Sequence, residues 1–191
     1  MRRIGITGGI GSGKSVVSRL LRIMGYSVYD TDSEAKRLME SSLEVVQKLS
    51  ECFGRDIYHN GRLNRGLLSS RVFGESDKIV LLNSIVHPVV RFDFYRWSES
   101  LNEEICFVES AILYESRFDE LVDEVWTVTA PEELRISRVR QRSGLTEEEI
   151  KKRMAAQLSE EEKQRRAAHI IWNGGNVSVI HRVLSLLKSL E

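Results

Sequence analysis

Five short apolar runs, separated by longer segments with helical spacing, set the pattern along this chain. They cover residues 3–7, 26–30, 104–110, 123–130 and 169–173. The third and fourth runs are apolar at almost every position, which is typical of strands covered on both faces of a parallel sheet. The first two runs and the segment between them fit one right-handed βαβ unit. The pattern predicts an α/β fold with a parallel five-stranded sheet and a helical insert after the second strand.

The segment between the first two runs predicts an amphipathic helix over residues 14–25. Its apolar side chains share one helical face: Val16, Val17, Leu20, Leu21 and Met24. Gly25 is expected to end the helix in a left-handed conformation, which glycine adopts without steric cost.

Residues 31–101 have a mostly helical pattern, which is interrupted at Gly54, at residues 59–62 and at His87-Pro88. Proline restricts the residue before it and cannot donate a backbone hydrogen bond. The His87-Pro88 pair therefore predicts a break in the helical pattern.

Three capping signals follow within a short stretch, at Thr129, Thr146 and Ser159, each with a glutamate three residues later. Such pairs satisfy the free N–H groups at a helix start. They predict several short helices with hinges between them. A last amphipathic helix is expected over residues 177–190.

Composition narrows the class of protein. The chain has 191 residues, with 28 basic and 28 acidic residues and two cysteines. A chain of this length buries enough surface to fold without disulfides. Cys106 lies in an apolar run and Cys52 in a helical pattern, so we expect both to be buried thiols, which fits the reducing cytoplasm. No apolar run approaches the ~20 residues that span a membrane, and no signal-peptide core is expected. The balanced charge and the lack of a groove-reading motif make nucleic acid a weak candidate partner.

The charges are distributed unevenly. Residues 102–133 contain ten acids and one base, whereas residues 134–166 contain ten bases and six acids. Most of these charges are expected to lie on solvated helical faces. A cluster of arginines after an acidic stretch is also typical of a lid that closes over an anionic ligand.

Residues 8–15, GGIGSGKS, fit the phosphate-loop pattern G-x-x-x-x-G-K-[ST] in a strand–loop–helix context. Glycines let consecutive N–H groups point at a phosphate, Lys14 reaches the β- and γ-phosphates, and the Ser15 hydroxyl binds Mg²⁺. The helix N-terminus adds positive potential. We expect these residues to hold the phosphates of a nucleotide: Gly9, Ile10, Gly11, Ser12, Gly13, Lys14, Ser15 and Val16.

Carboxylates stand at the ends of two predicted strands. Asp30 and Asp32 lie at the end of the second strand, and Glu109 ends the third. One aspartate can orient or deprotonate an attacking hydroxyl, and the other can hold Mg²⁺ through water. The alternative for Asp30 and Asp32 is an N-cap pair that starts a helix at Ser33. The alternative for Glu109 is an exposed charge at a strand end.

Three arginines, Arg135, Arg138 and Arg142, lie in one predicted helix. The planar guanidinium suits phosphate, and positive groups neutralise a phosphoryl group in transfer. We favour Arg138 and Arg142, which share one face, as phosphate contacts. Other bases of this segment are expected to be solvated: Arg140, Lys151 and Lys152. The four histidines show no metal-ligand spacing with each other or with the cysteines.

Ordered blocks along nearly the whole chain resemble the dephospho-CoA kinase family. They are GITGGIGSGKS, YDTD, GRLNRGLLSSRVF with LNSIVHPVV, RVRQRSGL with AAQLSEEEK, and IIWNGG. The resemblance implies an ATP- and Mg²⁺-dependent enzyme. It would transfer the γ-phosphoryl group of ATP to the 3′-hydroxyl of dephospho-CoA, with no obligatory protein partner.

The resemblance also implies a division of the chain. Residues 1–30, 102–134 and 167–191 would form the nucleotide-binding core, residues 31–101 the helical substrate domain, and residues 135–166 the lid.

Roles for single residues follow from the same resemblance. Lys14, Asp32 and Arg138 would be catalytic, with Asp32 as the base or orienting group. Ser15 and Asp30 would hold Mg²⁺, partly through water. ATP would also contact Arg142, as a lid arginine, and Asn173, beside the adenine. The acceptor substrate would contact these residues: Asp32, Arg65, His87, Glu109 and Arg138.

The chain departs from the family pattern at a few positions. Asn64 stands where an acid is usual, Ser110 and Ala111 near a usual proline, and Ala168 and Trp172 where an acid is frequent. A kinase of the same architecture that acts on another small hydroxyl or nucleotide is the nearest alternative. A nucleotide-dependent switch is less consistent with the chain, because the guanine-reading pattern N-K-x-D is absent.

Overall fold

The computed structural model describes residues 1–72, 74–175 and 177–190. The chain forms two compact units, one made of Met1–Asp30 with Asn102–Glu191 and the other of Thr31–Leu101. The first unit contains the main sheet, and the second is largely helical. In the described part of the chain, no helix combines the length and the apolar character that a membrane crossing requires.

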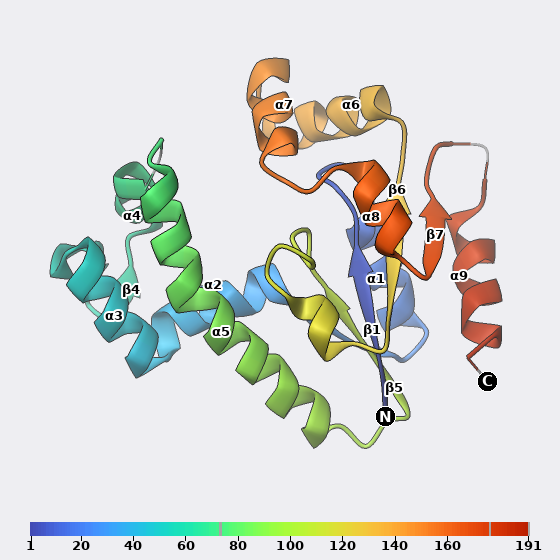
Figure 1. Cartoon of the computed structure of the whole chain (residues 1–191), viewed down its shortest axis with the longest axis horizontal. Coiled ribbons are helices and arrows are strands. Elements are labelled where there is room, and N and C mark those ends of the chain that lie inside the picture. The colour runs from blue at the N-terminus through green and yellow to red at the C-terminus, as the bar shows by residue number, and fades with distance from the viewer. Residues whose placement is uncertain (73, 176, 191) are drawn as a thin grey trace. The chain divides into compact units, whose positions relative to one another are not determined.

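The sheet of the first unit has five parallel strands in the order β2-β5-β1-β6-β7 (Figure 1). The strands are β1 (Arg2–Thr7), β2 (Ser27–Asp30), β5 (Ile105–Glu109), β6 (Glu124–Thr129) and β7 (His169–Trp172). Every strand expected from the apolar runs is present, and β1 occupies the centre. The parallel α/β prediction is therefore confirmed.

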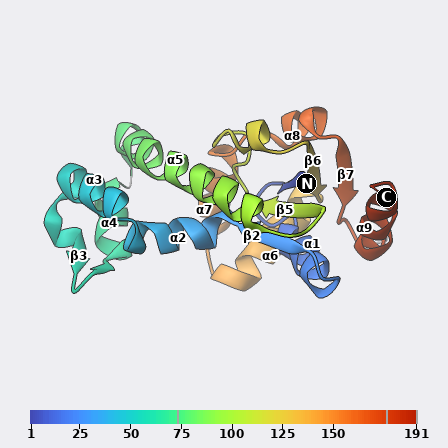
Figure 2. The ribbon, with the colours of Figure 1, turned by 90° about the horizontal axis from the view of Figure 1, so that it is seen from below.

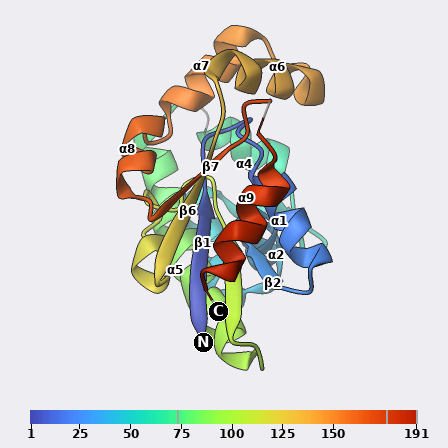
Figure 3. The same cartoon turned by 90° about the vertical axis from the view of Figure 1, so that its right-hand side faces the viewer.

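Helices α1 (Lys14–Ile23) and α9 (Val179–Lys188) cover one face of this sheet, as Figure 3 shows. Val17 and Leu21 are fully buried against Ile4, Ile6 and Phe107. The predicted apolar face of α1 was too wide, because Val16 is 55% exposed and Met24 is 38% exposed. Val16 points off the narrow stripe that contacts the sheet, and Met24 stands at the C-cap, beyond the last helical turn. Gly25 has a φ of +92°, as its predicted capping role requires.

Helix α8 (Glu160–Arg166) and the short 3-10 turn η2 (Phe118–Leu121) lie on the opposite face (Figure 3). Gly5 of β1 allows close packing there, because a Cβ at this position would stand 2.6 Å from Leu113 Cδ1.

Helices α6 (Glu132–Ser143) and α7 (Glu147–Ala155) lie beyond the carboxyl end of β1 (Figures 1 and 3). Ile136, Val139 and Ile150 form a small core between them. Thr146 and Glu149 make the predicted capping box, and Ser159 caps α8. The predicted cap at Thr129 was wrong. Thr129 is the last residue of β6, and its extended backbone leaves the helix to begin after Pro131.

The helices of the second unit pack on one another, and a two-stranded hairpin lies at the edge of the unit (Figure 2). Its elements are α2 (Thr31–Ser41), α3 (Leu43–Phe53), η1 (Arg55–Ile57), β3 (Tyr58–His59), β4 (Arg62–Leu63), α4 (Arg65–Val72) and α5 (Ser76–Ser100). The hairpin turns at Asn60 and Gly61, which both have positive φ, as the Asn-Gly pair favours. Leu49, Ile57 and Phe94 are buried in this unit.

Two predictions and one alternative interpretation for this unit were wrong. Helix α5 continues through Pro88, because Ile85, Val86 and Val90 are buried on both sides of the proline and hold the helix together. Cys52 is exposed on α3, where Val45, Leu49 and Phe53 form the buried stripe instead. Helix α2 begins at Thr31, so Asp32 lies inside its first turn and does not cap a start at Ser33.

Candidate phosphate-binding site

The carboxyl ends of three neighbouring strands bring Asp30 and Glu109 to the edge where the glycine-rich loop begins. Asp30 pairs in register with Glu109, and Glu109 with Ile6. Residues paired in this way point to the same face of a parallel sheet. Ile6 belongs to the core beneath α1. Both carboxylates therefore lie on the face that α1 covers, at the end from which the loop leads into α1.

The glycines of the loop allow a backbone that other residues would strain. Gly13 has a φ of +101°, and a Cβ there would stand 2.0 Å from Asn173 Nδ2. Gly8 lies so close to β6 that a Cβ would stand 2.1 Å from the Val128 carbonyl oxygen. The loop is thus packed between the sheet and the chain that follows β7, and glycine is required at both positions.

Three consecutive carbonyls of the loop accept hydrogen bonds from side chains of α6 and of the β7 end. They are those of Ile10 from Arg135 Nε at 3.0 Å, Gly11 from Arg138 Nη1 at 3.4 Å, and Ser12 from Asn173 Nδ2 at 2.8 Å. In a planar trans peptide, the carbonyl and the following N–H point in opposite directions. Holding these carbonyls therefore turns the N–H groups of Gly11 and Gly13 to the other side, which is the arrangement of an anion cradle.

Lys14 and the start of α1 add positive potential to this cradle. Lys14 Nζ donates to the carbonyl oxygens of Gly8 at 2.8 Å and Gly9 at 3.3 Å, so its ammonium group lies over the loop. The N-cap residue of α1 is Gly13, which has no side chain that could cap the first N–H groups. An uncapped helix start of this kind is a site for phosphate.

Arg135 is the most deeply buried arginine at the loop, and the sequence analysis did not select it. Its side chain is 5% exposed and lies 3.4 Å from the Glu160 carboxylate. Removing one partner of such a buried pair costs about 3–5 kcal/mol, because the other charge remains buried. Its position three residues before Arg138 was an available signal, since residues at i and i+3 share a helical face.

The other bases of α6 and α7 lie away from the loop contacts described above. Arg142 is exposed in the last turn of α6. Arg140 and Lys151 form exposed ion pairs with Glu147, at 3.4 Å and 2.8 Å. Arg140, Lys151 and Lys152 are all exposed, as predicted for solvated bases.

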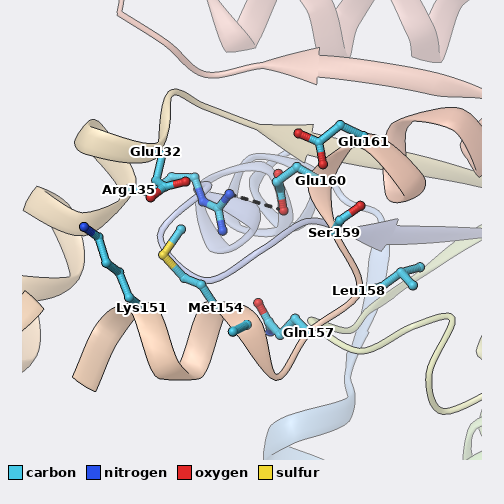
Figure 4. Close-up of a pocket in the computed structure, with 10 residues that line it drawn as sticks. Glu132, Arg135, Lys151, Met154, Gln157, Leu158, Ser159, Glu160 and Glu161 are labelled. Atoms are coloured by element: carbon cyan, nitrogen blue, oxygen red, sulfur yellow. Dashed lines mark ion pairs between the residues drawn. The ribbon is translucent and has the colours of Figure 1, made fainter. Parts of the chain in front are cut away.

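Two further residues that the sequence analysis missed bind N–H groups of the loop. Glu160 Oε1 accepts from Gly9 at 2.9 Å, and Gln157 Oε1 accepts from Ile10 at 2.9 Å. A pocket of about 410 Å³ adjoins these contacts (Figure 4). Its lining includes Glu132, Arg135, Lys151, Met154, Gln157 and Glu160. Both residues lie in the block AAQLSEEEK of the family resemblance, but nothing in the sequence marked them as contacts of the loop.

The residues expected to hold a metal ion carry oxygen donors. Within the described ranges, no three histidine, cysteine, aspartate or glutamate side chains form a metal-binding group. Mg²⁺ needs no such group, since it is usually held by one or two protein oxygens together with substrate phosphates and water. The Ser15 hydroxyl in the first turn of α1 and the Asp30 carboxylate on the face beneath α1 provide hard oxygen donors. The donor set therefore fits Mg²⁺.

The remaining predicted residues belong to the second unit and lie on three of its helices. Asp32 is exposed in the first turn of α2. Arg65 begins α4 and pairs with Glu40 at 3.1 Å. Asn64, where the sequence departs from the family pattern, accepts a hydrogen bond from Leu67 N at 3.0 Å and so caps α4. Phe73, the last residue of the block that contains Arg65, lies outside the described residues.

His87 is half-buried in the middle of α5. Burial lowers the pKa of its imidazole below the ordinary value, and the nearby positive charge of Arg91 lowers that pKa further. The neutral ring is therefore favoured near pH 7.

Known proteins resemble this chain along nearly its whole length. The family model for dephospho-CoA kinase matches residues 2–178. Dephospho-CoA kinase of Porphyromonas gingivalis is 40% identical over 192 residues, covering 100% of this chain and 95% of that protein. The corresponding enzyme of Corynebacterium diphtheriae is 40% identical over 187 residues, covering 96% of this chain and 94% of its own length.

Solved structures show the same fold. The structure of TT1252 from Thermus thermophilus superposes with a TM-score of 0.86 at 36% identity, covering 99% of this chain and 97% of that one. A shikimate kinase from Acinetobacter baumannii has a TM-score of 0.58 at 16% identity, covering 100% of this chain and 93% of its own, and shows likeness of fold alone. With a family model that matches nearly the whole length and relatives at this level of identity, the chain belongs to the dephospho-CoA kinase family.

Proposed function

We propose that this protein transfers the γ-phosphoryl group of ATP to the 3′-hydroxyl of the ribose in dephospho-CoA, giving CoA and ADP. The observation that carries the proposal is a phosphate loop whose carbonyls accept hydrogen bonds from Arg135 and Asn173, in a chain that matches the kinase family over residues 2–178. In the reaction, the O–H bond of the 3′-hydroxyl breaks as its oxygen bonds to the γ-phosphorus. The bond from that phosphorus to the bridging oxygen of ADP breaks at the same centre.

The loop residues, from Gly9 to Val16, hold the phosphates of ATP in this proposal. Lys14 neutralises the β- and γ-phosphates, and its present contacts place its ammonium group over the loop. Arg138 stabilises charge on the transferring phosphoryl group, and Arg142 adds a second cation from the lid. Asn173, whose side chain contacts the loop at Ser12, would neighbour the adenine, as the family resemblance implies.

A magnesium ion would be held by the Ser15 hydroxyl and by Asp30, partly through water. When bound with ATP, it neutralises and orients the phosphate oxygens. Asp32 receives or directs the proton of the 3′-hydroxyl, because phosphoryl transfer requires an oriented acceptor more than a strong base.

The acceptor binds through the unit of residues 31–101, which is our candidate substrate domain. Arg65 and His87 contact dephospho-CoA there, and Glu109 contributes from the end of β5. Residues 135–166 act as a lid that closes over both nucleotides. Closure excludes water, so that ATP is not simply hydrolysed.

The reaction is tested by incubating the protein with ATP, Mg²⁺ and dephospho-CoA and by following both CoA and ADP. We expect ADP to form with CoA in equal amounts, and much faster than without the acceptor. CoA itself is the matched control acceptor, since its 3′-oxygen is already phosphorylated. ADP formation that ignores dephospho-CoA would exclude the proposal. A panel of other hydroxyl and nucleotide acceptors distinguishes a kinase of different specificity.

Two further assignments accompany the proposal. Cys52 and Cys106 are free thiols, which fits a reducing compartment such as the cytoplasm. ATP and dephospho-CoA are the partners that the activity requires.

A further inference from the structure

Helix α8 presents a polar face to the interior. Glu160, Lys163 and Gln164 are spaced at i, i+3 and i+4, so they lie on one side of the helix. Lys163 is fully buried, and the other two are partly buried. Glu161, Arg165 and Arg166 are exposed. A surface helix normally buries apolar residues, so apolar packing does not explain why these polar side chains of α8 face inward.

The Glu160 carboxylate connects three elements of the nucleotide-binding unit. Its Oε1 accepts from Gly9 N–H at 2.9 Å and lies 3.4 Å from Arg135 Nη1. Its Oε2 accepts from the Thr129 hydroxyl, at the end of β6, at 3.1 Å. The carboxylate thus joins the phosphate loop, helix α6 and the sheet.

The contact at Gly9 leaves no space for a larger residue. A Cβ on Gly9 would stand 2.4 Å from Glu160 Oε1 and 2.2 Å from Arg135 Nη2. The carboxylate and the guanidinium therefore lie directly against the loop backbone (Figure 4). Small changes in either side chain would move the peptides of the loop.

Lys163, one helical turn after Glu160, contacts a second loop of the same unit. Its Nζ donates to the carbonyl of Ala111 at 3.0 Å and lies 3.8 Å from the Glu115 carboxylate. Ala111 follows β5, whose last residue is Glu109. The inner face of α8 thus holds both the loop after β1 and the segment after β5.

The loop contact leads directly to Lys14. Lys14 Nζ donates to the carbonyl oxygens of Gly8 and Gly9. The Gly8 carbonyl belongs to the same peptide as the Gly9 N–H group, which donates to Glu160. A shift of that peptide therefore moves the acceptors that orient the lysine. A carboxylate would repel a phosphate at direct contact, and Glu160 is already paired with Arg135. A role through the loop is thus favoured over contact with ATP.

We propose that Glu160 is a positioning residue for phosphoryl transfer, which holds the Gly9 peptide and Arg135 in place and through them orients Lys14. This inference rests on the proposed kinase function. It assigns to α8 the task of fixing the first half of the phosphate loop. Loss of this support should therefore slow the transfer of the γ-phosphoryl group more than it weakens the binding of ADP.

The test compares Glu160→Gln with Glu161→Gln, which changes the same charge at the exposed neighbour. We measure kcat, KM for ATP and for dephospho-CoA, and the dissociation constant of ADP by calorimetry. Glu160→Gln should lower kcat by about tenfold to a hundredfold, as expected for a misplaced reacting group. ADP affinity should stay within about twofold, and Glu161→Gln should match the wild type.

Two more variants make the test independent of folding. Thr129→Val removes the hydrogen bond to Glu160, together with one from Gln164, and keeps the side-chain shape, so it should lower kcat in the same direction by a smaller factor. The double variant Arg135→Gln/Glu160→Gln should be less impaired than the product of the single effects, because the pair acts as a unit. Active-site titration with ADP normalises each rate to folded protein.

Equal kinetics in Glu160→Gln and Glu161→Gln would overturn the inference. So would a loss of rate that disappears after normalisation to ADP-binding protein. These outcomes differ from a failure of the proposed function, in which the wild-type protein itself would bind ADP but would not form CoA.

Discussion

Arg138 and Asn173 form a hydrogen bond with each other, and both donate hydrogen bonds to the same carbonyl of the phosphate loop. Arg138 Nη2 donates to the Asn173 backbone carbonyl at 3.0 Å, while Arg138 Nη1 and Asn173 Nδ2 reach the Ser12 carbonyl at 3.5 Å and 2.8 Å. One guanidinium thus links α6, the end of β7 and the loop. The same group is our candidate for stabilising the transferring phosphoryl.

Replacement of Arg138 by alanine should reduce kcat by about 10²-fold, because a preorganised cation at the phosphoryl group is lost. Arg138→Lys should recover little of the rate, since an ammonium group cannot reproduce the planar fork. Arg140→Ala is the matched control, because Arg140 is exposed on the same helix and pairs with Glu147. Steady-state kinetics and melting curves of the three variants decide the question. A large drop in melting temperature with normal turnover would make Arg138 a structural residue.

Asp32→Asn should lower kcat by at least ~10²-fold and leave ATP binding nearly intact, as expected when a positioned proton acceptor is lost. Asp30→Asn should instead raise the Mg²⁺ concentration that gives half-maximal activity. Asp77, which lies exposed in the first turn of α5, provides a control for the loss of one helix-start carboxylate. If kcat is unchanged in Asp32→Asn, that residue has no part in the chemistry.

Gly13→Ala should destabilise the protein and abolish most activity. The left-handed φ of +101° costs about 1–2 kcal/mol for a residue with a Cβ. The new methyl group would also collide with Asn173, which stands 2.0 Å from its position. Gly25→Ala separates the two effects, because Gly25 has a φ of +92° but no atom within 4 Å of the added Cβ. Urea unfolding should show a larger loss for Gly13→Ala than for Gly25→Ala, and equal losses would rule out the collision.

Pro88→Ala should stabilise the second unit. Proline in a helix interior removes a hydrogen bond and costs about 3 kcal/mol, of which about 1 kcal/mol is offset by its restriction of the unfolded chain. Because α5 is helical on both sides of Pro88, alanine should raise the free energy of unfolding by about 1–2 kcal/mol. Thermal and urea unfolding measure the change. A decrease would mean that the packing of α5 requires the geometry imposed by proline.

His87 should make stability depend on pH in one direction. Its pKa is lowered on folding, chiefly by burial and further by Arg91. Between that lowered pKa and the unfolded value of about 6.5, the unfolded chain binds more protons, so this contribution to stability rises with pH. It is fully present above about pH 6.5 and is lost as the pH falls. The stability difference between wild type and His87→Gln, measured by urea unfolding, should therefore shrink under acid.

Much of the unit that contains the main sheet could be predicted from local sequence. The apolar runs of β5 and β6 identified buried parallel strands because both faces of the sheet are covered there. The order of glycines, Lys14 and Ser15 identified a phosphate loop, and the ordered blocks identified the family that the family model confirms. The roles of Asp32, Arg65, His87, Arg142 and the lid stay predictions.

The incorrect predictions share a cause. Pro88 and Thr129 were interpreted from rules about nearest neighbours, but packing on both sides carries α5 through the proline, and β6 extends as far as Thr129. Cys52 was predicted to be buried because its segment is helical. The packing of α3 on its neighbours decides which face of the helix is buried, and Cys52 lies on the other face.

The sequence by itself determined the strands, the phosphate loop and the family, because periodicity, glycine freedom and motif spacing are local properties of the chain. Only the tertiary structure decided that Arg135 of α6, Gln157 before α8 and Glu160 of α8 hold the loop. Those residues occur among many exposed charged and polar residues, so no local pattern distinguishes a solvated polar side chain from one that points inward. Their function follows from the contacts they make across the fold, which are set by how the helices pack on the sheet.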